Sequence, residues 1–171
     1  ILLLQPDLGT FLVIFFSIIG MYLVAGANWR DLLILVSTLL IVFLLLCFFR
    51  PYVQERVLTF LNPNRDPLGS GYQIQQSLIA IGSGGLFGRG FGQSVQKFNY
   101  LPEPIGDSIF AVAGEEFGFV GSISIIFLFI FITLRGLKIA NNKKDLFGKF
   151  LAVGIVLLII SQSLINISSM L

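Results

Sequence analysis

Two carboxylates four residues apart, Glu103 and Asp107, lie where a polar stretch of the chain meets an apolar one. A carboxylate can take a proton from an attacking hydroxyl group, which accelerates such a reaction by about 10²–10⁴-fold. Aspartate is also favoured at a helix N-cap, and an apolar run begins shortly after Asp107. The residues therefore leave two roles open for Asp107, a general base and a helix cap, and the two can coexist.

The composition indicates that this chemistry takes place at a membrane. Of the 171 residues, 56% are hydrophobic and only 12% are charged, and the mean hydropathy is +0.92. This is more apolar surface than one water-soluble core of such a length could bury. The net charge of +2 comes from scattered basic residues, so nucleic acid is not an expected partner.

The types of residue that are missing narrow the chemistry further. The sequence contains no histidine and a single cysteine, Cys47, which lies in an apolar run. Within these residues, a disulfide framework and a zinc site of cysteine and histidine are excluded. The commonest general base, histidine, is absent as well. Any acid–base chemistry therefore falls to carboxylates.

Four segments are apolar and long enough to cross a bilayer, which takes about 20 residues. They comprise residues 8–25, 32–49, 108–134 and 150–170. The third contains Glu115 and Glu116, and carboxylates inside a span are costly. We expect one of them to face a polar cavity and the other to reach the interface or pair with a cation such as Arg89. The pattern predicts an all-α, polytopic integral membrane protein with about four transmembrane helices.

The charges of the connections predict how the chain is oriented. Residues 135–149 contain five Lys or Arg and one Asp, and a short basic loop of this kind stays in the cytoplasm. Residues 50–107 then form a long extracytoplasmic loop. The chain begins without Met, without a basic stretch and without a signal-peptide cleavage site, so we interpret its start as an interior point of a longer protein.

The loop of residues 50–107 is where we expect the functional groups. Residues 53–61 and 72–81 have amphipathic spacing, which predicts two helices at the membrane surface. Six glycines follow between residues 82 and 92, on either side of Arg89. Such a run lets backbone N–H groups approach phosphate oxygens, with Arg89 and Lys97 nearby. A flexible surface turn is the alternative interpretation of the same run.

Three stretches resemble the SEDS family (shape, elongation, division and sporulation), to which FtsW, RodA and SpoVE belong. They are QPDLGT near the start, the run from NPNRDPLGSG through GEEFGFVG, and SQSLINISSM at the end. Within the family, SVQKFNYLPE is closer to the FtsW branch, which acts in cell division, than to RodA. The resemblance covers essentially the whole chain. It implies that residues 1–171 are a single membrane domain from the C-terminal half of a larger helical bundle.

The resemblance also implies an activity. Such proteins are peptidoglycan glycosyltransferases that polymerise lipid II at the outer face of the cytoplasmic membrane. Their pattern L-P-E-x-H-T-D-F-I-F places its proposed catalytic aspartate on Asp107. Here Ile105 and Gly106 replace the His-Thr pair and Ser108 replaces the first Phe. As substrate-binding residues we predict Glu103, Arg89, Lys97, Gln76, Ser77, Gly84, Gly85 and Glu116.

A single carboxylate base suits this reaction, because a diphosphate leaving group needs no acid when cations hold it. Arg89, Lys97 or a divalent cation, Mg²⁺ or Mn²⁺, would supply that charge, and Asp107 is a possible metal ligand. We expect no organic cofactor. The expected partners are lipid II, the growing glycan strand, a class B penicillin-binding protein transpeptidase and other divisome proteins.

A different class of function stays open from the sequence alone. In a transporter (flippase) of lipid-linked peptidoglycan precursors, polar intramembrane groups would line a path and Asp107 would be only a gate or a cap. Inverted repeats or paired broken helices would favour that interpretation, and the four predicted spans show no internal repeat. A scaffold of the division machinery is a third possibility, which would leave Asp107 without a chemical role.

Overall fold

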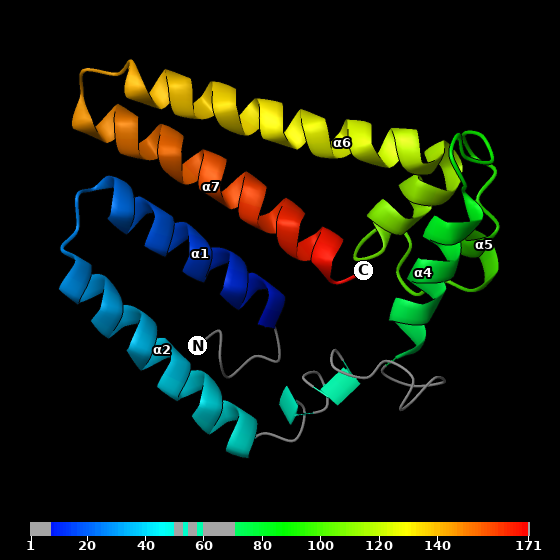
Figure 1. The fold of residues 1–171 in the computed structure, drawn as a ribbon, viewed down its shortest axis with the longest axis horizontal. Helices are drawn as coiled ribbons and strands as arrows, with labels where there is room; N and C mark the ends of the chain where they lie inside the picture. The colour runs from blue at the N-terminus through cyan, green and yellow to red at the C-terminus, as the bar shows by residue number, and fades with distance from the viewer. Residues whose placement is uncertain (1–7, 50–52, 55–57, 60–70, 171) are drawn as a thin grey trace. The chain divides into compact units, whose positions relative to one another are not determined.

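The computed structural model describes residues 8–49, 53–54, 58–59 and 71–170 (Figure 1). Helices joined by turns make up this part of the chain, and it contains no strand. The helices are α1 (Leu8–Val24), α2 (Trp29–Phe49), α4 (Tyr72–Ser83), α5 (Gln96–Asn99), α6 (Ile109–Asn141) and α7 (Leu146–Ser168). The all-α prediction is confirmed. The predicted helix at residues 53–61 lies largely outside the described residues.

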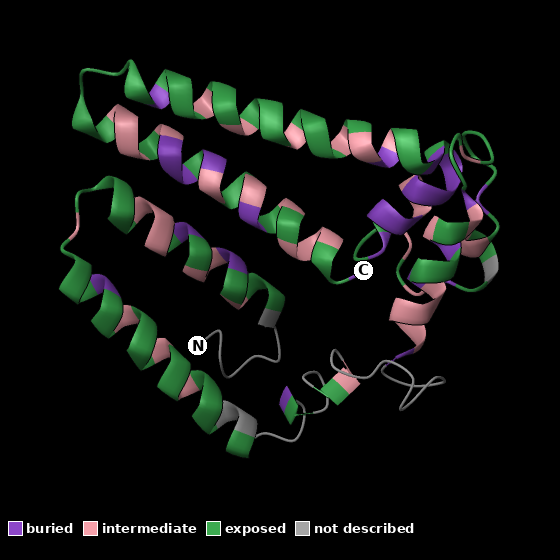
Figure 2. Ribbon diagram, in the orientation of Figure 1, coloured by how far each residue is buried: buried purple, intermediate pink, exposed green. Residues whose placement is uncertain are grey.

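Long apolar helices occupy the predicted membrane spans. α6 and α7 each contain an 18-residue stretch of high mean hydropathy, 2.5 and 2.3, and are long and apolar enough to cross a membrane. α1 is apolar but shorter, with 17 residues, and α2 has 21 residues. Most of the surface of these four helices is exposed or half-buried, as Figure 2 shows. Apolar side chains left exposed in this way are typical of helices that face lipid.

The structure corrects the boundaries of the third span and of the basic loop. The sequence predicts a span at residues 108–134 and a loop at residues 135–149, whereas α6 continues to Asn141 and α7 begins at Leu146. Arginine and lysine are good helix formers, so the helix continues through Arg135 and Lys138 instead of ending at the first charge. The connection between the two helices is therefore only four residues long.

The chain divides into two compact units, of which the first comprises residues 1–55 and 130–165. Glycines occupy the contacts between its helices. A Cβ on Gly20 of α1 would lie 2.7 Å from Leu157 of α7, and one on Gly154 would lie 3.1 Å from the sulfur of Met21. Small residues let membrane helices approach closely, which is the main source of their packing energy in lipid. α1 and α7 therefore lie side by side (Figure 1).

The second unit comprises residues 56–129 and 166–171, and it contains every predicted site residue. Its apolar core joins α4, the turn before α6, the first turn of α6 and the residues that follow α7. The core residues are Ala80, Leu101, Phe110, Ala111 and Met170. Each of these side chains is less than 10% exposed. The start of α6 is thus anchored in the core of its unit.

α6 is not one continuous helix. Gly118 has φ +67° and ψ −165°, a conformation that is essentially restricted to glycine. It separates a short helical segment, residues 109–117, from the longer segment of residues 119–141. The sequence analysis treats this stretch as one span and misses the break. GEEFGFVG gives only a weak signal for it, because an isolated glycine is tolerated in many helices.

Candidate active site at the start of α6

Asp107 and Glu103 lie in the turn that leads into α6, and both are exposed. Within the described part of the chain, neither carboxylate has a hydrogen-bond or ion-pair partner. Glu103 has φ +44°, a left-handed conformation that few residues other than glycine adopt. Two exposed carboxylates without a partner among the described residues therefore lie just before the start of an apolar helix.

Hydrogen bonds hold the backbone around Asp107, whereas its carboxylate has no partner among the described residues. The side-chain amide of Asn166, near the end of α7, donates a hydrogen bond of 3.3 Å to the carbonyl oxygen of Asp107. The hydroxyl of Ser108 donates to the carbonyl of Pro102 at 3.0 Å, and the Ser108 N–H donates to the carbonyl of Glu103 at 3.3 Å. These bonds hold the turn from both sides, so Asp107 is presented from a defined position.

The helix-cap role that the sequence leaves open for Asp107 is not what the structure shows. Ser108 is the residue directly before α6, and its carbonyl accepts the N–H of Val112. The turn thus moves the cap position one residue beyond Asp107. Ser108 is fully buried, and its hydroxyl also accepts a hydrogen bond of 3.3 Å from Gln73 of α4. The serine that departs from the family pattern therefore joins α4 to this turn.

Residues 84–90 insert into the break of α6 and replace the hydrogen bonds that the helix loses there. In a continuous helix, the N–H groups of residues 119 and 120 would donate to the carbonyls of residues 115 and 116. Here they donate to Gly85 and Leu86, at 2.9 and 3.1 Å. The carbonyls of residues 115 and 116 accept instead from the N–H groups of residues 89 and 90, both at 3.0 Å.

Glycines of this run let the backbone of residues 84–90 approach α6 closely enough for the insertion. A Cβ on Gly84 would collide with the carbonyl oxygen of Gly114, and one on Gly88 would collide with that of Glu116. The carbonyl of Gly85 is occupied by the N–H of Phe119. The run is therefore a hydrogen-bonded packing element, and the interpretation as a plain surface turn is wrong. Its predicted contact with phosphate groups, at Gly84 and Gly85, stays a prediction.

Glu115 is completely buried, and four groups surround its carboxylate. The Ser94 hydroxyl donates at 2.6 Å, and the N–H groups of Val95 and Gln96 donate at 3.1 and 3.3 Å. The Nε of Arg89 lies 3.5 Å away, so the expected pairing of one of these glutamates with Arg89 is confirmed. The Arg89 side chain remains 42% exposed. Glu115 faces donors of the loop, not a polar cavity.

Glu116 is 5% exposed and pairs with Lys97, whose Nζ lies 2.5 Å from one carboxylate oxygen. The two neighbouring carboxylates thus have different cationic partners, as expected from the angle of about 100° between adjacent side chains of a helix. The predicted roles of Glu116 and Lys97 as substrate ligands stay predictions. In this structure each of the two charges is already balanced by the other.

The remaining predicted residues lie on α4. Ser77 is fully buried, and its hydroxyl has no hydrogen-bond partner among the described residues. Gln76 is half-buried. The residue of α4 that does reach the Asp107 turn is Gln73, which the sequence analysis missed. The family-like run contains Gln73 one helical turn before Ser77, but the sequence offers no sign that it bonds to Ser108.

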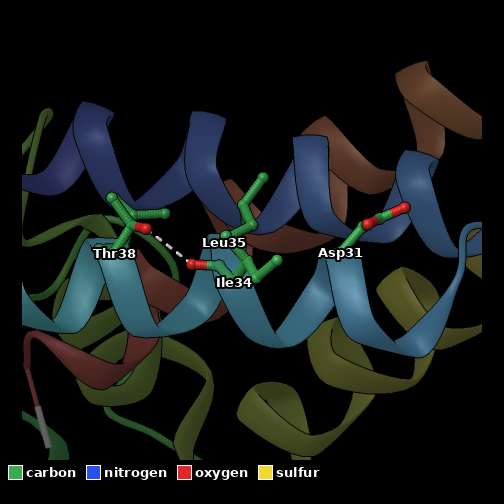
Figure 3. Close-up of a pocket in the computed structure, with 5 residues that line it drawn as sticks. Asp31, Ile34, Leu35 and Thr38 are labelled. Carbon is green, nitrogen blue, oxygen red and sulfur yellow. Dashed lines mark hydrogen bonds between the residues drawn. The ribbon is translucent and has the colours of Figure 1, made fainter.

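One hollow lies elsewhere, in the first unit (Figure 3). It has a volume of about 390 Å³, and residues of α2 alone line it: Asp31, Ile34, Leu35, Thr38 and Leu39. The hydroxyl of Thr38 is occupied by the carbonyl of Ile34 at 2.7 Å. None of the predicted site residues lines this hollow. No group of three or more potential metal-binding side chains occurs among the residues that the structure describes.

Comparison with known proteins decides the family. The family model described as "Cell cycle protein", which covers FtsW, RodA and SpoVE, matches residues 1–171. The chain belongs to this family. It is therefore a polytopic integral membrane protein of the SEDS group, as the resemblance implies.

Individual proteins similar to this SEDS protein support the same family assignment. It is 50% identical over 98% of its length to Stage V sporulation protein E of Bacillus subtilis, and it covers 46% of that protein. It is 41% identical over 99% of its length to the probable peptidoglycan glycosyltransferases FtsW of Buchnera aphidicola and Shewanella sediminis, covering 49% and 42% of them. The chain thus spans about half the length of these relatives.

Proposed function

We propose that the full-length protein is a peptidoglycan glycosyltransferase that polymerises lipid II at the outer face of the cytoplasmic membrane, with Asp107 as its general base. The main support is the Asp107 carboxylate itself. It is exposed and unpaired among the described residues, while the backbone that carries it is tied to Asn166 and, through Ser108, to Pro102. The names of the FtsW relatives support the same activity.

The proposed reaction follows from this arrangement. The 4-hydroxyl of one sugar attacks the anomeric carbon of another, and an undecaprenyl diphosphate leaves with the bonding electrons. Asp107 accepts the hydroxyl proton as the new bond forms. The half-exposed Arg89 provides positive charge for the diphosphate, which then needs no proton donor. A direct displacement of this kind inverts the anomeric centre.

Glu103 is proposed to orient the sugar beside Asp107, or to share a divalent cation, Mg²⁺ or Mn²⁺, with it. Its side chain is exposed and unpaired within the described ranges, and it lies in the same turn. A hard cation bound by carboxylates and substrate phosphates is a common arrangement for Mg²⁺. The proposed partners are lipid II, the growing glycan strand, a class B penicillin-binding protein transpeptidase and other divisome proteins.

The test is polymerisation of purified lipid II by the full-length protein and its Asp107→Asn variant. Loss of the base should lower turnover by at least about 10²-fold, with an unchanged melting temperature. The matched control is Asp145→Asn, which removes an exposed carboxylate that only accepts the Gly148 N–H at the start of α7. This control should retain activity.

Near-normal polymerisation by a folded Asp107→Asn protein would refute the proposal. If that variant instead blocked the movement of lipid II across vesicle membranes, the transporter interpretation would replace it.

A further inference from the structure

Glu115 and Glu116 each bind the loop of residues 89–97 through two groups, the backbone carbonyl and the side-chain carboxylate. Their backbone carbonyls accept the N–H groups of residues 89 and 90, both at 3.0 Å. Their carboxylates hold the next part of the same loop, where Glu115 accepts from residues 94–96 and Glu116 pairs with Lys97. Two adjacent residues of α6 therefore contact a continuous stretch of the loop between Arg89 and Lys97.

Burial makes these two glutamates poor candidates for direct contact with a sugar or a diphosphate. Glu115 is 0% exposed and Glu116 is 5% exposed. A buried carboxylate is costly unless it is paired and hydrogen-bonded. Glu115 has three donors and Arg89 beside it, and Glu116 has Lys97. Their side chains are thus fully used within the protein.

The same short helical segment connects this contact to Asp107. Residues 109–117 begin directly after the Asp107 turn and end with Glu115, Glu116 and the break at Gly118. Arg89, the half-exposed cation of the loop, is bound to the far end of that segment through its N–H. A rigid helical segment therefore carries the carboxylate at one end and the loop at the other.

We propose that Glu115 and Glu116 form a two-carboxylate clamp that holds residues 89–97 in a fixed position on the segment of residues 109–117, and that this sets the position of Arg89 relative to Asp107. They are positioning residues and not substrate ligands. The proposal of a role in turnover rests on the proposed glycosyltransferase function, whereas the clamp itself can be measured without it.

The first measurement is amide hydrogen exchange across residues 85–97 in the full-length protein in detergent. Glu115→Gln leaves one acceptor oxygen where three donors converge, so exchange of this stretch should become about tenfold faster or more. Ser94→Ala, which removes only the 2.6 Å bond, should give a smaller rise and serves if Glu115→Gln does not fold. Asp145→Asn should leave exchange there unchanged. Unchanged exchange in both Glu115→Gln and Ser94→Ala would refute the clamp.

The second measurement separates positioning from substrate binding. In lipid II polymerisation, Glu116→Gln should lower kcat and leave KM within about twofold, because the clamp acts on geometry and not on substrate affinity. Reversing the pair, with Glu116→Lys and Lys97→Glu together, should recover much of the kcat that each single variant loses. A raised KM with unchanged kcat, or no recovery on reversal, would overturn the positioning role in favour of direct diphosphate binding by Lys97.

The two measurements can refute the clamp and the proposed function independently of each other. A wild-type protein that folds but does not polymerise lipid II would refute the proposed function, and hydrogen exchange alone would then decide whether the clamp exists. Faster exchange in Glu115→Gln together with wild-type turnover would refute the positioning role of the clamp and leave the proposed function standing.

Discussion

The side-chain amide of Asn166 donates a hydrogen bond to the backbone carbonyl of Asp107, 59 residues earlier in the chain. Asn166 lies near the end of α7, so the last turns of this helix support the turn that carries the proposed base. The acceptor carbonyl thus belongs to the residue whose side chain is the proposed base.

Replacement of Asn166 by Ala should therefore reduce polymerisation without abolishing it. The hydrogen bond has a net free energy of about 0.5–1.5 kcal/mol, and a small displacement of Asp107 adds to that loss because the reaction depends on geometry. We expect kcat to fall by roughly tenfold. Gln162→Ala, one turn earlier on the exposed face of α7, is the matched control. Equal rates in the two variants would show that the Asn166 bond does not position Asp107.

Arg89→Gln should lower turnover sharply, and Arg89→Lys should restore it only in part. A guanidinium group can engage two phosphate oxygens at once, whereas an ammonium group acts as a point charge. The measurement is the polymerisation rate against lipid II concentration for the three proteins. Arg135→Gln is the control, because Arg135 is an exposed arginine of α6 that belongs to the first unit, whereas Arg89 belongs to the second. Equal rates for all three Arg89 proteins would leave a divalent cation as the diphosphate ligand.

Gly118→Ala should destabilise the protein far more than Gly82→Ala. The backbone conformation alone costs an alanine roughly 1–3 kcal/mol, and its Cβ would lie 2.7 Å from the backbone of Leu86. Gly82→Ala is the control, since a Cβ there meets nothing within 4 Å in a helical position. Thermal unfolding of both variants in detergent makes the comparison. A Gly118→Ala protein as stable as wild type would contradict the described insertion.

The predicted orientation can be tested by cysteine labelling in a Cys47→Ser background. Gln93 and Asn142 are both exposed, one in the loop that carries the site and one in the basic connection between α6 and α7. A membrane-impermeant thiol reagent should label Gln93→Cys on intact cells and Asn142→Cys only after permeabilisation. We expect this difference in labelling because short basic loops stay in the cytoplasm. Labelling of both cysteines from the same side would overturn the orientation.

Local pattern is enough to predict all the described helices of this chain except the short α5. Apolar runs predict α1, α2, α6 and α7, and amphipathic spacing predicts α4, because both depend on neighbours in sequence. The insertion at Gly118 is not predictable in this way. It joins residues 85–90 to residues 115–120 by backbone hydrogen bonds, and backbone groups leave no residue-specific signature.

The same limit applies to individual side chains. Glu115, Glu116 and Arg89 attract attention because charge is rare in an apolar chain, and each of the three forms an ion pair, Glu115 with Arg89 and Glu116 with Lys97. Gln73 and Ser94 are ordinary polar residues, and their importance comes only from what the fold places beside them. Sequence therefore identifies the charged members of the site, and the neutral residues that hold them require the structure.

The break at Gly118 also changes how much of α6 has to lie in hydrocarbon. As one continuous helix, its 33 residues would be about 50 Å long, far more than the roughly 30 Å of a bilayer core. The segment after Gly118 alone is about 35 Å long and can cross the membrane unaided. Residues 109–117 are then free to lie at the level of the lipid headgroups. Two adjacent glutamates cost less insertion free energy at that level than in the hydrocarbon core, and Asp107, which precedes the segment, would lie at the same level.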